Sequence, residues 1–327
     1  MAVERIDARL LTEERWAPLD GVIPVILTHA LEAASSSLPS WDAKAWCKCV
    51  RMRHGEKRVR FSHRSPRIGQ GRAETIEAPL TMVLGEMARG GHDENSLYMD
   101  EMLLAEDPDL RHEVLGRLPG PLREDYFQEH FPPGLPVPPI CFIVGGPGSR
   151  STLHADHLSW TAWNLLLNGE KRWRFYRRRP ALDAVFAAKR SPIWGKEVRP
   201  EGLAANWTSD GDLYYYRDEA LAGEATFRPR LAQGAEGEIP APDYEVVQRS
   251  GEMIVFPGDW WHQTYHHTAS VAVCAQYCNR RNLGRVLGHV LDWCRVPQEQ
   301  AEEVLSEGAG RPLPERIGEA LRVASGG

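Results

Sequence analysis

The residues best suited to chemistry in this chain are two histidines and a carboxylate. His154 and Asp156 form a His-x-Asp triplet, and His262 follows much later in Phe256-Pro-Gly-Asp-Trp-Trp-His262. In a strand, residues two apart project from the same face, so a triplet in a strand would send His154 and Asp156 into one cavity. Two histidines and one carboxylate on one face are the ligand set of a mononuclear non-haem iron(II) site with positions left open.

The His-x-Asp triplet alone does not identify a metal site, because an ordinary polar strand end can contain the same residues. The distant His262 is what favours a metal site. His262 follows the run 251–257, which predicts an apolar strand closed by a Pro-Gly turn, a suitable place for a third ligand at a barrel mouth. The carboxylate of Asp156 favours an enzyme that inserts oxygen over one that halogenates. A halogenating enzyme would need a small residue at position 156, so that the metal keeps a position open for a halide. The neighbouring histidines are interpreted as non-ligands: His157 by strand alternation, His266 and His267 as parts of a loop.

A second constellation surrounds Asn168-Gly169, a strong signal for a tight β-hairpin. In such a hairpin Leu166 pairs with Lys171 and Asn164 faces Trp173, so the four share one face. A lysine among apolar neighbours is costly to bury alone. Either Lys171 extends to solvent at the hairpin end, or it pairs with a dicarboxylate to which Asn164 adds a hydrogen bond.

Short strands are expected to position these residues. The sequence predicts strands over 22–27, 140–144, 161–167, 171–176, 252–257 and 270–277. Helices are predicted over 78–88, 108–116 and from 283 onward, with two more near 297–306 and 313–324. This pattern favours a mainly β fold, a double-stranded β-helix (cupin or jelly-roll) core with helical N-terminal and C-terminal additions.

We expect a division into a mixed α/β region that supports the barrel, a catalytic core and C-terminal helices. The predicted ranges are 1–135, 136–280 with a loop-rich insertion at about 180–245, and 281–327. The apolar stripe of the C-terminal helices either covers the barrel or mediates a homodimer.

Composition narrows the class of protein. The chain has 327 residues and a net charge of -6, which argues against wholesale nucleic-acid binding. The sequence contains no apolar run long enough for a membrane span and no secretory leader, so we expect a cytoplasmic or nuclear protein without membrane contact. The basic run Arg51–Arg72 indicates either a solvated face or a rim for RNA. A zinc site at Cys47 and Cys49 with His54 or His63 has poor spacing.

Several segments together resemble a known family, the Jumonji-C (JmjC) oxygenases. They are Thr152-Leu-His-Ala-Asp156, Ala162-Trp-Asn164, Asn168-Gly-Glu-Lys-Arg-Trp173 and Pro257-Gly-Asp-Trp-Trp-His262. The resemblance covers roughly residues 3 to 290 and is closest to the bifunctional arginine demethylase and lysyl hydroxylase subgroup, once called the phosphatidylserine receptor. It implies an Fe(II)- and 2-oxoglutarate-dependent dioxygenase, with ascorbate as reductant, that hydroxylates or demethylates lysine or arginine in a protein or peptide.

The resemblance also assigns individual roles. Iron would be held by His154, Asp156 and His262, and Lys171 would bind the distal carboxylate of 2-oxoglutarate. Further cosubstrate contacts are implied for Asn164, Tyr98, Ser151 and Gln276. Cys274 and Gln276 stand where the subgroup has threonine and asparagine, and a thiol is the weaker donor. An RNA-directed oxygenase of the same fold and a cupin that binds without catalysis stay open as alternatives.

Overall fold

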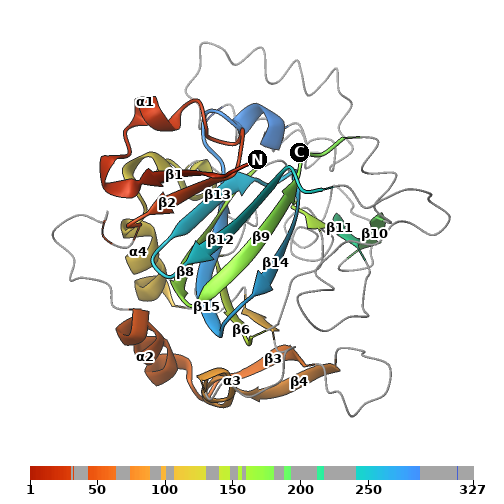
Figure 1. Cartoon of the computed structure of the whole chain (residues 1–327). Coiled ribbons are helices and arrows are strands. Elements are labelled where there is room, and N and C mark those ends of the chain that lie inside the picture. The colour runs from red at the N-terminus through yellow and green to blue at the C-terminus, as the bar shows by residue number, and fades with distance from the viewer. Residues whose placement is uncertain are drawn as a thin grey trace.

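The protein, described by a computed structural model, is mostly β-structure arranged in two sheets (Figure 1). The structure describes residues 1–30, 32, 43–63, 74–88, 97–100, 107–129, 140–147, 154–156, 160–179, 188–192, 212–216, 241–287 and 315. Within these ranges the two-sheet arrangement is consistent with a cupin or jelly-roll fold.

The larger sheet has nine strands in the order β1-β2-β13-β8-β15-β6-β5-β3-β4. They are β1 (Glu4–Asp7), β2 (Val25–Thr28), β13 (Met253–Pro257), β8 (Thr161–Asn168), β15 (Ser270–Tyr277), β6 (Cys141–Gly145), β5 (Leu97–Asp100), β3 (Arg58–His63) and β4 (Glu74–Pro79). The central strands β13, β8, β15 and β6 pair antiparallel. Strands from the N-terminal third extend this sheet at both edges.

The smaller sheet has six strands in the order β10-β11-β7-β14-β9-β12. They are β10 (Ala188–Pro192), β11 (Asp212–Tyr216), β7 (His154–Ala155), β14 (Trp261–His266), β9 (Glu170–Tyr176) and β12 (Tyr244–Arg249). Consecutive strands from β6 to β9 and from β12 to β15 alternate between the two sheets. Because consecutive strands enter opposite sheets, residues far apart in the sequence come to face one interior.

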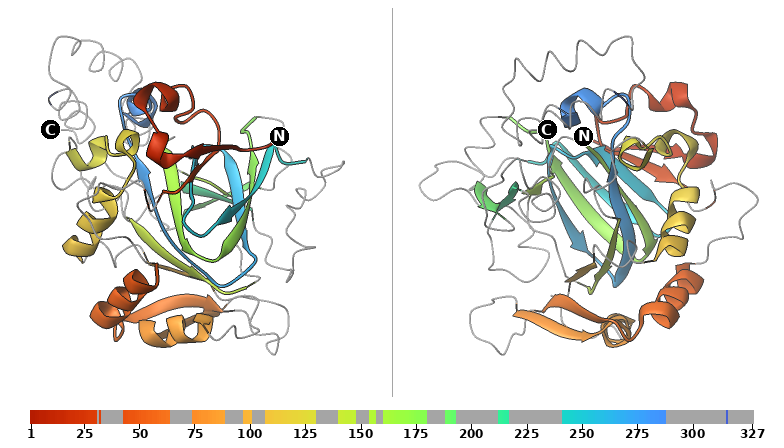
Figure 2. Two further views of the ribbon diagram at one scale, coloured as in Figure 1. Left: turned by 60° about the vertical axis from the view of Figure 1, so that its left-hand side comes forward. Right: turned by 180° about the vertical axis from the view of Figure 1, so that it is seen from behind.

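Helices are few and short in the described part of the chain. They are α1 (Glu13–Trp16), α2 (Ala43–His54), α3 (Leu80–Ala88), α4 (Pro108–Gly116) and α5 (Tyr126–Glu129), with 3₁₀ turns η1 (Ala8–Leu10) and η2 (Gly120–Leu122). Figure 2 shows α4 and the segment after it on the outer side of the larger sheet, away from the smaller sheet. Among the described residues, no helix combines the length and apolarity that crossing a bilayer would require.

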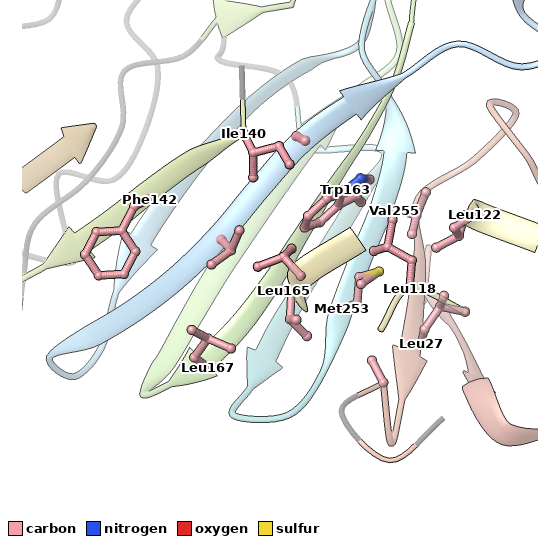
Figure 3. Packing of buried hydrophobic residues seen from close by; sticks show 14 of the residues in the cluster. Leu27, Leu118, Leu122, Ile140, Phe142, Trp163, Leu165, Leu167, Met253 and Val255 are labelled. Atoms are coloured by element: carbon pink, nitrogen blue, oxygen red, sulfur yellow. The ribbon is translucent and has the colours of Figure 1, made fainter. Parts of the chain in front are cut away.

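Alternate residues of β8 build the core on the outer face of the larger sheet. Trp163, Leu165 and Leu167 belong to one buried apolar cluster with Leu118 and Leu122, which follow α4 (Figure 3). Because successive strand residues point to opposite faces, the residues between them point toward the smaller sheet.

The inner faces of the two sheets meet in a second apolar cluster. Ala162 of β8 and Ile254 of β13 pack there with Trp173 and Phe175 of β9. Lys171 shares the strand face of Trp173 and Phe175, and Asn164 shares that of Ala162, by the period of two. The space between the sheets is therefore where a site can form.

The Asn168-Gly169 dipeptide forms the tight turn that connects β8 of the larger sheet with β9 of the smaller sheet, here called the Gly169 corner. Gly169 has a φ of 95°, and a Cβ there would lie 2.4 Å from the carbonyl oxygen of Ala269. The Glu170 backbone N–H donates to Thr268 Oγ1 at 2.9 Å, which ties the corner to the β14–β15 connection. The tight turn is therefore held by close backbone approach, and only glycine fits it.

The predicted hairpin pairing across this turn is wrong, because β8 and β9 enter different sheets. Asn164 pairs with Ile254 and Cys274, whereas Trp173 pairs with Val246 and Thr264. The face shared by Asn164, Leu166, Lys171 and Trp173 therefore cannot follow from hairpin register. Facing sheets, rather than paired strands, turn these positions toward one interior.

Most predicted elements match within a few residues. The predicted strand 270–277 and helix 108–116 have the bounds of β15 and α4. The interval 180–245, predicted as loop-rich, includes β10 and β11, which extend the smaller sheet. The predicted helices near 297–306 and 313–324 lie outside the described residues except for Glu315, and the basic run is described only up to His63.

Candidate metal and cosubstrate site

His262 lies on β14, an inner strand of the smaller sheet, and its side chain faces the space between the two sheets. Its side chain is 3% exposed, and its ring centroid lies 4.7 Å from that of Phe256 and 6.2 Å from that of Trp173. Both aromatic residues belong to the cluster between the sheets. A polar ring in this apolar setting needs partners for both nitrogens.

The two nitrogens of His262 have different neighbours. Nδ1 lies 3.0 Å from the carbonyl oxygen of Trp260, and Nε2 lies 3.8 Å from Asp156 Oδ1. A carbonyl can only accept, so in the neutral ring Nδ1 carries the hydrogen and Nε2 presents its lone pair toward Asp156. This tautomer is the one a metal ligand requires, with its second nitrogen bonded to a backbone carbonyl.

Gly258 brings the segment after β13 close to Asp156. The Asp156 backbone N–H donates to the Gly258 carbonyl at 2.7 Å, and the Gly258 N–H donates to the Trp160 carbonyl at 2.9 Å. A Cβ at position 258 would lie 2.7 Å from Trp160 Cδ1, so a side chain there would push the segments apart. The Pro-Gly turn thus positions Asp156 relative to His262.

His154 lies directly opposite His262 in the β7–β14 ladder. The structure describes its backbone only. Among the side chains that the structure describes, Asp156 and His262 are not joined by a third histidine, cysteine or carboxylate. The backbone register nevertheless places His154 opposite His262 on adjacent strands of the smaller sheet, and Asp156 follows directly after β7.

Lys171 is buried on the inner face of β9, with 1% of its surface exposed. Its ammonium forms no hydrogen bond or ion pair with any residue in the described part of the chain. Burial lowers the pKa of Lys171 to about 8, and the neighbouring Cys274 partly opposes that shift. An ammonium buried without a counter-ion is unfavourable, so this position is suited to an incoming anion.

Asn164 contributes the second unsatisfied group. It is 3% exposed, and its buried Oδ1 has no hydrogen-bond partner among the residues that the structure describes. In the ladder Asn164 lies opposite Cys274, the residue whose interaction with Lys171 partly opposes the lowering of the lysine pKa. Unpartnered buried polar atoms are rare in native proteins, so Asn164 Oδ1 and the Lys171 ammonium are groups that a bound polar ligand or water would satisfy.

Gln248 was not singled out in the sequence, yet it joins the two sheets beside this pair. Trp173 Nε1 donates to Gln248 Oε1 at 2.8 Å, and Gln248 Nε2 donates to the backbone carbonyl oxygens of Asn164 at 2.8 Å and Glu252 at 2.9 Å. Its position opposite Lys171 in the β12–β9 ladder required knowledge of the sheet order. We infer that it supports the strands that carry the site.

The interpretation of His266 as part of a loop is wrong. It is the last residue of β14 and is 1% exposed. Strand alternation from His262 through Thr264 to His266 is the signal that would have found it. His267, by contrast, lies beyond the strand and packs edge-on against the Tyr265 ring at 5.4 Å.

The remaining predicted positions differ in how far the structure describes them. Gln276 is half-buried on β15, on the strand face opposite the outer cluster. Tyr98 pairs with Val144 in the β5–β6 ladder, and only its backbone is described. Ser151 and His157 lie outside the described residues. At the suggested zinc position, His54 Nε2 instead lies 2.7 Å from Asp107 Oδ2.

Comparison with known proteins finds relatives of low sequence identity that are named as demethylases or oxygenases. No family model matches the chain. The chain is 27% identical over 222 residues to arginine-specific demethylase JMJ22 of Arabidopsis thaliana, which covers 66% of the chain and 38% of that protein. It is 28% identical over 168 residues to bifunctional arginine demethylase and lysyl-hydroxylase psr-1 of Caenorhabditis briggsae, covering 51% and 36%.

A third relative carries a different name. The chain is 23% identical over 178 residues to 2-oxoglutarate and iron-dependent oxygenase JMJD4 of Gallus gallus, covering 54% of the chain and 34% of that protein. The matches support a JmjC-domain assignment. The chain spans well under two thirds of the length of the curated relatives it matches.

Proposed function

We propose that this JmjC-domain chain is an Fe(II)- and 2-oxoglutarate-dependent oxygenase acting on a lysine or arginine side chain of a protein. The observation that carries the proposal is the inner face of the smaller sheet. The buried His262, with the partly buried Asp156 carboxylate 3.8 Å away, shares that face with Lys171, a buried cation without a partner among the described residues. The relatives named as oxygenases and demethylases support the same class of reaction.

The metal would be held by His154, Asp156 and His262. The donor types fit iron(II), because two imidazoles and one carboxylate leave positions for a chelating cosubstrate and O₂. Bound iron would supply O₂ activation coupled to oxidative decarboxylation of 2-oxoglutarate to succinate and CO₂. Asp156 contributes negative charge, and the Trp260 carbonyl holds the His262 ring in the required tautomer.

The cosubstrate would be positioned by Lys171 and Asn164 between the sheets. Lys171 would neutralise the distal carboxylate in a charge-assisted pair, which removes the cost of burying its ammonium alone. Asn164 would donate its amide N–H to the same molecule, and its unpartnered Oδ1 would accept a hydrogen bond from a bound water. Tyr98, Ser151 and Gln276 are proposed as further polar contacts on the resemblance alone.

The surrounding aromatic side chains would keep bulk water away from the reacting atoms. Trp173, Phe175 and Phe256 surround the His262 ring, with centroids within 6.2 Å. Water exclusion strengthens electrostatic contacts and limits side reactions. The two sheets would together form a double-stranded β-helix around this interior.

Uncoupled turnover is the direct test. Purified chain with Fe(II), 2-oxoglutarate and ascorbate should form succinate and consume O₂, and His262→Ala should abolish both. A peptide and RNA screen for a gain of one oxygen or a loss of methyl would then identify the substrate. Oxygen gain on RNA would favour the RNA-directed alternative, and undiminished succinate in His262→Ala would refute the site.

A further inference from the structure

The inner face of β14 carries a second histidine beside the buried lysine. His266 lies directly opposite Lys171 in the β14–β9 ladder, and each is 1% exposed. Residues directly opposite in an antiparallel pair project to the same face, so the imidazole and the ammonium line one end of the interior. The charge on Lys171 contributes to lowering the pKa of His266, in agreement with their positions opposite each other.

Ser270 and the Gly169 corner hold the His266 ring in place. Nδ1 of His266 is hydrogen-bonded to the hydroxyl of Ser270, which is itself buried. A Cβ on Gly169 would lie 2.8 Å from Ser270 Cα, so this corner packs directly on the serine. The His267 backbone N–H donates to the Glu170 carbonyl at 2.9 Å and closes the same corner. These contacts therefore fix the position of the His266 ring relative to Lys171.

The chemistry of this end suits an anion with two binding atoms. Burial and the charge on Lys171 hold the pKa of His266 well below its usual range, so the ring is neutral. The other groups that face Lys171 from neighbouring strands are the Cys274 thiol and the Gln248 amide, and the amide is already bonded to Trp173 and to two backbone carbonyls. Within the described chain, no carboxylate pairs with the ammonium.

We propose that His266 is a second donor of the cosubstrate subsite, binding with Lys171 the distal carboxylate of a 2-oxo dicarboxylic acid. In this arrangement the Ser270 hydroxyl donates to Nδ1, which leaves the hydrogen on Nε2 for the carboxylate. One carboxylate oxygen would take the Lys171 ammonium and the other the imidazole N–H. Selectivity for a dicarboxylate over a monocarboxylate would then depend on both residues. This inference rests on the proposed function.

Paired ligands separate this role from general stability. Anaerobic titration calorimetry of the Mn(II)-loaded chain would measure 2-oxoglutarate and 2-oxopentanoate, which keeps the 2-oxo acid and has a methyl group in place of the distal carboxylate. His266→Ala should weaken 2-oxoglutarate by roughly tenfold, as for one lost hydrogen bond to a charged group. Binding of 2-oxopentanoate should stay unchanged.

Three variants act as controls and alternatives. His267→Ala removes the adjacent histidine outside the interior and should leave both dissociation constants unchanged. His266→Gln keeps an N–H donor and should restore part of the preference, and it carries the test if His266→Ala does not fold. Ser270→Ala frees the ring and should give a smaller loss that is again confined to 2-oxoglutarate.

The outcomes separate two failures. If the wild-type chain does not bind 2-oxoglutarate in the presence of metal, the proposed function fails and this inference fails with it. If the wild type prefers 2-oxoglutarate but folded His266→Ala or His266→Gln keeps the full preference, only the role of His266 is overturned. Equal weakening of both ligands would mean that His266 supports the pocket rather than the carboxylate.

Discussion

The two ends of β14 carry the same residue type on the same inner face in opposite electrostatic surroundings. His262 faces the Asp156 carboxylate at 3.8 Å, whereas His266 lies opposite the Lys171 ammonium. A carboxylate favours a bound cation, and an unpaired ammonium favours a bound anion. Strand alternation supplies the common face, and the neighbouring strands β7 and β9 decide what each end can bind. The comparison predicts that the two ends can be disabled separately.

The largest effect is expected at the carboxylate end. Asp156→Ala removes the charge that attracts the metal and should weaken Fe(II) binding by more than about 100-fold, since even outer partners of metal ligands contribute 10- to 100-fold. Metal content after dialysis and the anaerobic Mn(II) dissociation constant measure it. Retained metal affinity in a folded Asp156→Ala chain would remove the carboxylate from the ligand set.

At the lysine end, substitution of Lys171 should weaken 2-oxoglutarate binding and at the same time stabilise the ligand-free fold. Lys171→Met replaces a buried ammonium that has no counter-ion among the described residues by an apolar chain of similar length, and should weaken 2-oxoglutarate binding roughly 100-fold. The same change should stabilise the ligand-free fold by about 1–3 kcal/mol, because it removes the cost of burying the charge. Isothermal titration and thermal unfolding test both, and an unchanged melting temperature would show that Lys171 has a partner.

Titration of the same lysine provides a smaller, graded effect. With a folded-state pKa of about 8, Lys171 loses its charge as pH rises through that value, so 2-oxoglutarate affinity should fall above pH 8. The unfolded chain keeps this proton up to the ordinary value of 10.5, so it binds more protons between 8 and 10.5. Stability of the ligand-free protein should therefore rise with pH in that window. Lys171→Met should flatten both profiles, and matching profiles in the two proteins would assign the titration elsewhere.

The smallest effects are expected from two glycines, one at each end. Gly258→Ala meets Trp160 Cδ1 at 2.7 Å and should weaken metal binding a few-fold. Gly169→Ala, at a φ of 95°, meets the Ala269 carbonyl at 2.4 Å and should instead weaken 2-oxoglutarate. Each should also cost about 1–3 kcal/mol of stability from strain. If either variant alters both ligands equally, the ends are not independent.

Part of this arrangement could be predicted from the sequence because strand patterns are local. Short apolar runs mark β8 and β15, and the Asn168-Gly169 turn was correctly located. The polar string Trp-His-Gln-Thr-Tyr-His gave no apolar signal, so β14 was not predicted as a strand and His266 was assigned to a loop. Burial of polar groups depends on neighbours that a local pattern does not contain.

Sheet membership was the other limit. A tight turn usually joins paired strands, but here β8 pairs with β13 and β15 while β9 pairs with β12 and β14. These pairings involve residues far along the chain, which no dipeptide can encode. The positions of Asn164 and Lys171 could be predicted as inward-facing, yet the reason is the packing of two sheets. Gln248 shows the same limit, because its role appears only once both sheets are in place.

One measurement tests the central claim that the two ends of β14 form a single metal and cosubstrate site. Anaerobic titration of 2-oxoglutarate into the Fe(II)-loaded chain should give saturable binding with a metal–ligand charge-transfer absorption. The absorption should vanish in Asp156→Ala through loss of metal, and in Lys171→Met through loss of 2-oxoglutarate while the metal stays bound. Metal-independent 2-oxoglutarate binding, or an unchanged absorption in both variants, would contradict the account.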